Sequence, residues 1–72
     1  MTGLPSLGAL VVDAGHGDRM GEFRGVAGPY WYLRPICGGK EWEADPTRVR
    51  QASEPERLNA EAASRVGRRV LP

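Results

Sequence analysis

The stretch GPYWYLRPICGGKEWEADP, residues 28–46, holds four of the chain's five aromatic residues between turn-forming residues. Its first half, YWYLRPI, is rich in aromatic and branched residues, and KEWEA returns after the turn-forming residues CGG. Aromatic and branched residues favour strands, and a short glycine-containing link joins antiparallel strands into a hairpin. The stretch therefore predicts a β-hairpin whose rings form either a core or a binding surface.

Alternation separates the side chains of this hairpin into two groups, because successive residues of a strand point to opposite faces. Trp31 and Leu33 share one face. The other face carries Tyr30, Tyr32 and Arg34, whose phenols and guanidinium tolerate water. We therefore expect the first group to form the core, joined by two residues of the returning strand, Trp42 and Ala44.

Two further strands are expected before the hairpin. ALVVDA, residues 9–14, is a short apolar run that stops at the glycine loop GHGD. RMGEFRGV, residues 19–26, alternates so that Phe23 points inward between two glycines. Glycines beside an inward ring suit a bent strand that a neighbour crosses closely, as small barrels require.

The segment after the hairpin predicts a helical turn and a last strand. Asp45 is suited to cap a short helical turn, and Pro46 is suited to its first position. RVRQA, residues 48–52, then reads as a brief final strand. Together these elements predict a mainly β chain, a small barrel of four to five antiparallel strands with one short helical turn.

A C-terminal helix follows. Ser53 and Glu56 form the S-x-x-E capping box, and Gly67 is expected to end the helix. An apolar stripe at steps of four residues is expected to dock on the barrel or on a partner, and it consists of Leu58, Ala62 and Val66. The predicted organisation is a flexible lead-in at residues 1–8, the barrel at 9–52, the helix at 53–67 and a basic tail at 68–72.

Residues 17–52, together with the valine-rich first strand, resemble a group of small uncharacterised proteins of high-GC Gram-positive bacteria. The shared motifs are D-R-x-G-E, Y-L-R-P, G-G-x-E-W-E-A and D-P. The resemblance implies an SH3-like barrel related in shape to KOW and Tudor-type modules, and it implies no established activity. This chain departs from the pattern at Phe23, where a smaller aliphatic residue is common, and at Cys37 in the hairpin turn.

The composition limits the classes of function that we expect for this protein. Seventy-two residues make one domain, and ten basic residues nearly cancel nine acidic ones, so the net charge of +1 creates no large field for a polyanion. With one cysteine, Cys37, an internal disulfide is excluded. The apolar run near the N-terminus resembles neither a signal peptide nor a membrane span, so we expect a cytoplasmic protein without a membrane partner.

Two constellations bear on catalysis or metal binding. Asp13, His16 and Asp18 lie within six residues, but a metal site needs more ligands and the chain has no second histidine. We interpret them as a polar glycine loop in which aspartates cap backbone amides. Cys37 paired with His16 would be a nucleophile, but the spacing does not support the pair, and the cysteine is interpreted as a small hydrophobe. We expect no cofactor, no metal and no enzymatic activity.

The remaining candidate is the outward aromatic face. Tyr30, Tyr32 and Arg34 share it, and Arg24 is expected on the adjacent strand, so a ring lies beside a cation. We expect a non-enzymatic module that binds another protein through these four residues. The alternative is weak nucleic-acid binding by the same face, assisted by phosphate contacts from the tail, and self-association through the C-terminal helix stays open. The candidate phosphate contacts are Arg65, Arg68 and Arg69.

Overall fold

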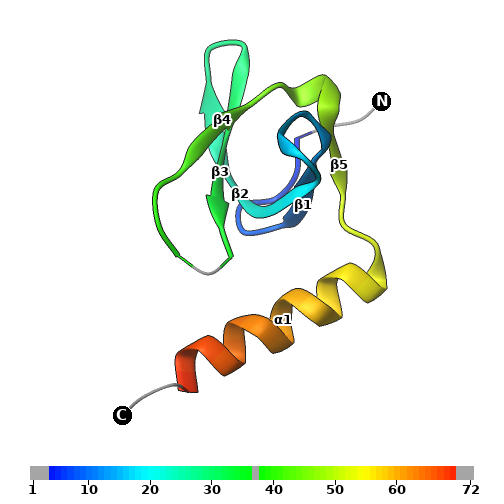
Figure 1. The fold of residues 1–72 in the computed structure, drawn as a ribbon. Helices are drawn as coiled ribbons and strands as arrows, with labels where there is room; N and C mark the ends of the chain where they lie inside the picture. Colours follow the sequence, from blue (N-terminus) through cyan, green and yellow to red (C-terminus); the bar gives the residue numbers. More distant parts are fainter. Residues whose placement is uncertain (1–3, 37, 70–72) are drawn as a thin grey trace.

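The computed structural model describes the backbone of residues 4–36 and 38–69, and the side chains as far as residue 62. Five antiparallel strands form one sheet in the order β4-β3-β2-β1-β5, with α1 to one side of it (Figure 1). The strands are β1 (Leu10–Asp13), β2 (Arg19–Ala27), β3 (Tyr30–Pro35), β4 (Trp42–Ala44) and β5 (Val49–Gln51). The helical elements are the 3-10 turns η1 (Ala14–His16) and η2 (Pro46–Arg48) and the helix α1 (Glu54–Arg69).

The expected mainly β architecture is confirmed, but closure into a barrel is not. The sheet curls strongly (Figure 1), yet β4 and β5 are its two ends, and no ladder joins them in the described part of the chain. The predicted hairpin is β3 and β4, paired from Trp31 with Ala44 to Leu33 with Trp42. β4 is shorter than KEWEA suggested.

The inward group of side chains forms the core, as alternation predicted. Leu33 has no exposed surface, and it packs in one cluster with Val11, Phe23 and Ala44. The partly buried members around this cluster are Trp31, Trp42 and Val49. Phe23 and Trp31 meet edge to face, with ring centroids 5.2 Å apart. Burial of these apolar groups is the main force that holds a chain without disulfides together.

A β-bulge bends β2 beside this core. The register with β3 pairs Phe23 with Leu33 and then Gly25 with Tyr32, so Arg24 is the extra residue. A bulge increases the local twist of a strand and redirects its side chains. The glycine next to the inward ring therefore marks the bend that the sequence pattern indicated.

The helical turn after β4 is confirmed, and the turn expected after β1 as a glycine loop contains a second 3-10 helix. The carboxylate of Asp45 accepts a hydrogen bond from the Thr47 amide at 3.0 Å, with Pro46 in the first position of η2. Asp13 similarly caps η1, where a loop was expected, by accepting from the Gly15 amide at 2.9 Å. Asp-x-x segments thus start both 3-10 turns, since the short carboxylate satisfies amides that the turn leaves free.

The capping box of α1 is confirmed, but its docking face is not the predicted one. Ser53 and Glu56 exchange hydrogen bonds, at 2.8 Å from the Ser53 amide and 3.3 Å from the Glu56 amide. The predicted apolar stripe fails at Leu58, which is 58% exposed, whereas Ala60 is buried. Ala62 is also exposed, and the side chain of Val66 lies outside the described ones.

The reason for the different docking face is an ion pair at the start of the helix. The two terminal guanidinium nitrogens of Arg50 on β5, Nη1 and Nη2, each donate to the carboxylate of Glu56 at 2.9 Å. This pair turns position 56 toward the sheet, and position 60 follows one helical turn later on the same side. Leu58, two residues away, therefore points to solvent.

The helix also continues beyond Gly67 to Arg69, so the predicted end at that glycine is wrong. Glycine inside a helix costs only about 1 kcal/mol relative to alanine, so it does not by itself stop one. None of the helices in the described residues is both long and apolar enough to cross a membrane.

Candidate functional site

Four residues make up the aromatic-basic face, which we define as Tyr30, Tyr32, Arg34 and Arg24. The three β3 residues alternate with the buried core residues of the same strand, so they point away from the core. Tyr30 is 45% and Tyr32 is 37% exposed, and both arginines are exposed. Arg24 sits at the bulge of β2, next to the pairing of Gly25 with Tyr32. The structure therefore brings these predicted residues onto adjacent strands.

Carboxylates accompany every cation of this face. Arg24 Nε lies 3.9 Å from a carboxylate oxygen of Glu41. Glu22 is the register partner of Arg34, and Glu43 is the register partner of Tyr32. Opposite residues of antiparallel strands share a face. The aromatic-basic face is therefore close to neutral, with two arginines among three glutamates.

A second cluster, which the sequence did not reveal, surrounds the carboxylate of Asp13. It consists of Asp13, His16, Arg19 and Trp42, and we call it the Asp13 cluster. The indole Nε1–H of Trp42 donates to Asp13 Oδ2 at 2.8 Å, and His16 Nδ1 lies 2.6 Å from the same oxygen. With the amide of Gly15 on Oδ1, the carboxylate has three partners and no exposed surface.

Trp42 is held on several sides in this cluster. The guanidinium carbon of Arg19 lies 4.0 Å from the centre of its ring, and the ring of His16 meets it edge-on with centroids 6.3 Å apart. Gly21 supplies space, because a Cβ there would lie 2.7 Å from Trp42 Cη2. The indole thus fills a site formed by β1, β2 and η1.

The Asp13–Trp42 hydrogen bond links strands that are not neighbours. Trp42 is on β4, at one end of the sheet, and Asp13 is on β1, which is hydrogen-bonded to β5 at the other end. The curl of the sheet brings the two side chains together. A side-chain bond therefore spans the open side of the sheet where no ladder does.

Opposing effects set the charge of Asp13. Burial raises the pKa of its carboxyl, but hydrogen bonds from Trp42, His16 and Gly15 outweigh burial, and the pKa lies below its ordinary value. A carboxylate that accepts several hydrogen bonds is stabilised in its charged form. Asp13 is therefore an ionised acceptor, and it fixes the orientation of both rings.

The expected capping role of this loop is confirmed for Asp13, but the three loop residues do not form one set. Asp18 takes the left-handed conformation with φ of 59°, and within the described residues no hydrogen bond or ion pair joins it to Asp13 or His16. In that same part of the chain no group of three or more potential ligands is arranged for a metal ion. In the sequence, the one sign of the Asp13 cluster was an aspartate at the end of a buried strand. Its long-range partner Trp42 lies 29 residues away, so the sequence did not indicate the hydrogen bond between them.

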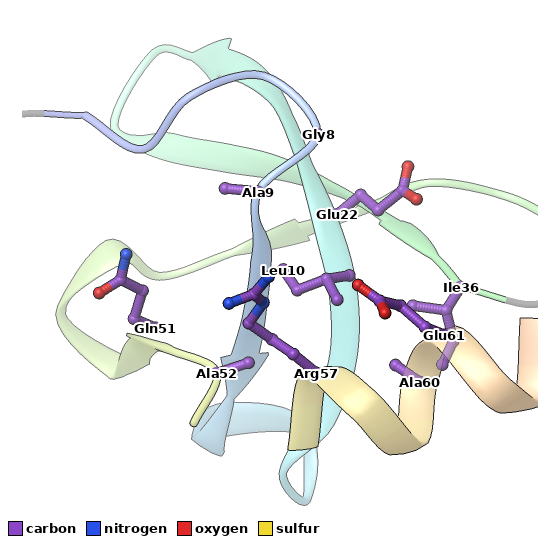
Figure 2. A pocket seen from close by; sticks show the side chains of 10 residues that line it. All are labelled: Gly8, Ala9, Leu10, Glu22, Ile36, Gln51, Ala52, Arg57, Ala60 and Glu61. Atoms are coloured by element: carbon purple, nitrogen blue, oxygen red, sulfur yellow. The ribbon is translucent and has the colours of Figure 1, made fainter. Parts of the chain in front are cut away.

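A groove separates α1 from the sheet (Figure 2). It has a volume of about 670 Å³ and is lined on the sheet side by Leu10 and Glu22 and on the helix side by Arg57, Ala60 and Glu61. Ala60 is buried at the base of the helix side of this groove, which Ile36 also lines. The groove combines apolar walls with charges of both signs.

Four of the candidate site residues named from the sequence have side chains outside the described ones. Cys37 is not described, so its suggested pairing with His16 has no structural counterpart. The side chains of the proposed phosphate contacts are also outside the described set, which ends at residue 62, and they are Arg65, Arg68 and Arg69.

Comparison with known proteins gives no relative. Neither protein-family models, nor curated proteins, nor solved structures match the chain significantly. The case for function therefore depends on the residues of the chain itself.

Proposed function

We propose that the protein is a small module that binds another protein through its aromatic-basic face. One observation carries this proposal: Tyr30 and Tyr32 expose their rings on the side of β3 that the core does not use. Tyrosine and arginine are enriched at protein interfaces, where tyrosine contributes large contact area at little cost in side-chain entropy. The fold does not need these rings for its core, so they are free to bind.

The charge pattern favours a protein over a nucleic acid as the partner. The face pairs Arg24 with Glu41 and places Glu43 beside Tyr32. Phosphate binding depends on uncompensated cations, because the affinity comes from the release of counterions. A near-neutral face with two exposed phenols suits a polypeptide with proline or aromatic residues.

We propose that the curled sheet is an SH3-like barrel of the KOW and Tudor type. Its support is the strand order β4-β3-β2-β1-β5, with the 3-10 turn η2 immediately before β5. The Asp13–Trp42 hydrogen bond supports it further, because it spans the side on which such a barrel closes. Fold alone does not define function, so the binding proposal rests on the aromatic-basic face.

The experiment compares two double variants as bait in pull-downs from cells that produce the protein, read by mass spectrometry. Y32A/R34A changes the aromatic-basic face, and R57A/L58A changes two exposed side chains of α1. Urea unfolding first establishes that both variants are folded. We expect a partner that wild type and R57A/L58A retain and Y32A/R34A loses. Equal recovery of that partner by Y32A/R34A contradicts the proposal.

Fluorescence anisotropy with short single-stranded DNA and RNA at low salt tests the nucleic-acid alternative. We expect no binding at concentrations of tens of micromolar. Binding that falls steeply with salt and is lost in Y32A/R34A would instead favour a nucleic acid as the occupant of this face.

A further inference from the structure

His16 is the chain's one histidine, and its two ring nitrogens lie in different surroundings. Nδ1 is 2.6 Å from the buried Asp13 carboxylate, whereas the side chain as a whole is 50% exposed. An ionised carboxylate only accepts hydrogen bonds, so Nδ1 carries the proton in this contact. The lone pair of the neutral ring is then on Nε2.

This arrangement has the features that activate an imidazole. A buried carboxylate on Nδ1 fixes the tautomer and the ring orientation, and it stabilises the positive charge that forms when Nε2 gains a bond. Asp13 is itself held by the Trp42 indole and the Gly15 amide, so it cannot easily turn away. The ring that carries the nucleophilic nitrogen is therefore half exposed and held on a fixed support.

We propose that His16 Nε2 is a nucleophilic site that accepts acyl groups from small activated esters, with Asp13 as its positioning residue. The site lies on the inward side of the sheet, at Asp13 and Trp42, whereas Tyr32 and Glu43 mark the outward side. It goes beyond the binding function proposed above, which assigns no chemistry to the protein.

The reaction with an ester is balanced with water as the only co-reactant. The Nε2 lone pair forms a bond to the carbonyl carbon, and the bond to the leaving oxygen breaks, which releases an alkoxide or phenolate. The acylated ring gives up its Nδ1 proton to solvent. Water then attacks the acyl carbon, the C–N bond breaks, and the carboxylic acid and the original imidazole are restored.

Neighbouring residues suggest which esters react best. Arg19 places a guanidinium over the Trp42 ring, and His16 meets the edge of the same ring. The arginine attracts an anionic substituent of the ester. We therefore expect an ester with a carboxylate tail to react faster than its neutral counterpart.

The test follows release of para-nitrophenolate from para-nitrophenyl acetate and from the matching succinate half-ester. All proteins carry Cys37→Ser, which removes the competing thiol. We expect at least tenfold faster release than with the same concentration of free imidazole, and His16→Gln should lower the rate to background. A rate at or below that of free imidazole, or an unchanged rate in His16→Gln, overturns the proposal.

The positioning role of Asp13 is tested by a measurement that would not change if the residue were only structural. Proton–nitrogen correlation NMR of the single imidazole reports its tautomer directly. We expect the Nδ1-protonated tautomer in the wild type and its loss in Asp13→Asn, together with a fall in rate of at least tenfold. An Nε2-protonated tautomer in the wild type contradicts the proposal even if the Asp13 variant is unfolded.

Two further variants separate this site from its surroundings. Arg19→Gln should reduce the preference for the succinate half-ester over the acetate, and an unchanged preference would contradict the role given to Arg19. Y32A/R34A should react at the wild-type rate, so the outcome does not depend on the proposed binding function. A loss of reactivity in Y32A/R34A of the same size as in His16→Gln would contradict the assignment.

Discussion

Asp13 combines burial, charge and long-range bonding in one side chain. It has no exposed surface and accepts hydrogen bonds from Trp42, His16 and Gly15. Hydrogen bonds to a charged group are worth about 1.5 to 3 kcal/mol each, and a buried charge that loses its partners costs more. The residue is therefore the one at which small chemical changes should have the largest effect on stability.

Trp42→Phe tests how much Asp13 contributes to stability, because it removes one of the hydrogen-bond donors to the Asp13 carboxylate. The change removes the Nε1–H bond to Asp13 and part of the ring, and we expect it to lower the free energy of unfolding in urea by about 2 to 4 kcal/mol. Trp31→Phe is the matched control, because Trp31 packs edge-on against Phe23 at the rim of the same core. A loss in Trp42→Phe no larger than that in Trp31→Phe would contradict the role given to the hydrogen bond.

Acid should weaken the fold through the same residue. Because the pKa of Asp13 is lower in the folded protein than its ordinary value of 3.8, its stabilising contribution is present above that value and is lost as the pH falls through the folded one. The Arg50 hydrogen bonds lower the pKa of Glu56 to about 2, so it contributes in the same direction and range.

Urea midpoints between about pH 5 and pH 2.5 measure this dependence. We expect the midpoint to fall as the pH decreases, and to fall less steeply in Asp13→Asn and in Glu56→Gln. A wild-type urea midpoint that rises as the pH falls would contradict the stabilising contributions predicted for both carboxylates.

At the scale of elements, close approach between β2 and Trp42 depends on a glycine. A Cβ at Gly21 would lie 2.7 Å from Trp42 Cη2 and 2.8 Å from the backbone oxygen of Arg34, which cannot swing away. Gly21→Ala should therefore cost about 3 kcal/mol through overpacking. Gly17→Ala is the control, since its φ of 71° is left-handed but its surroundings are open, and it should cost about 1 kcal/mol. Equal losses in urea unfolding would contradict this packing.

The helix offers a second test among the elements. Ala60 is buried against the sheet, while Leu58 is 58% exposed. Ala60→Glu should release the helix, lowering the circular dichroism at the helical minimum and the protection of its amides from hydrogen exchange. Leu58→Glu, with a larger loss of hydrophobicity, should change neither. A stronger effect in Leu58→Glu would show that the sequence-based stripe, and not the observed face, docks.

The elements also show what sequence patterns predict well. Alternation placed Phe23, Leu33 and Ala44 in the core and the two tyrosines outside, because strand periodicity depends only on neighbours in the chain. Capping residues predicted η2 and the start of α1, because a cap also depends only on neighbours in the chain. The helix face and the Asp13 cluster were not predicted, since both depend on partners from distant strands, Arg50 for Glu56 and Trp42 for Asp13.

At the scale of the whole molecule, the proposed binding face and the core occupy different sides of one sheet. The inward side carries the core and the Asp13 cluster, and the outward side carries the aromatic-basic face. Y32A/R34A should therefore lie within about 1 kcal/mol of the wild type in urea, because exposed substitutions have small effects. A larger loss would mean that the face has a structural role and would weaken its assignment to binding.

A curled, open sheet is held across its open side by the Asp13–Trp42 hydrogen bond. Proton–nitrogen NMR tests this directly, because the two tryptophans give two indole N–H signals. We predict that the Trp42 indole proton exchanges slowly with solvent and that Asp13→Asn accelerates its exchange without changing that of Trp31. Fast exchange of the Trp42 indole in the wild type, or no change on Asp13→Asn, would contradict the account.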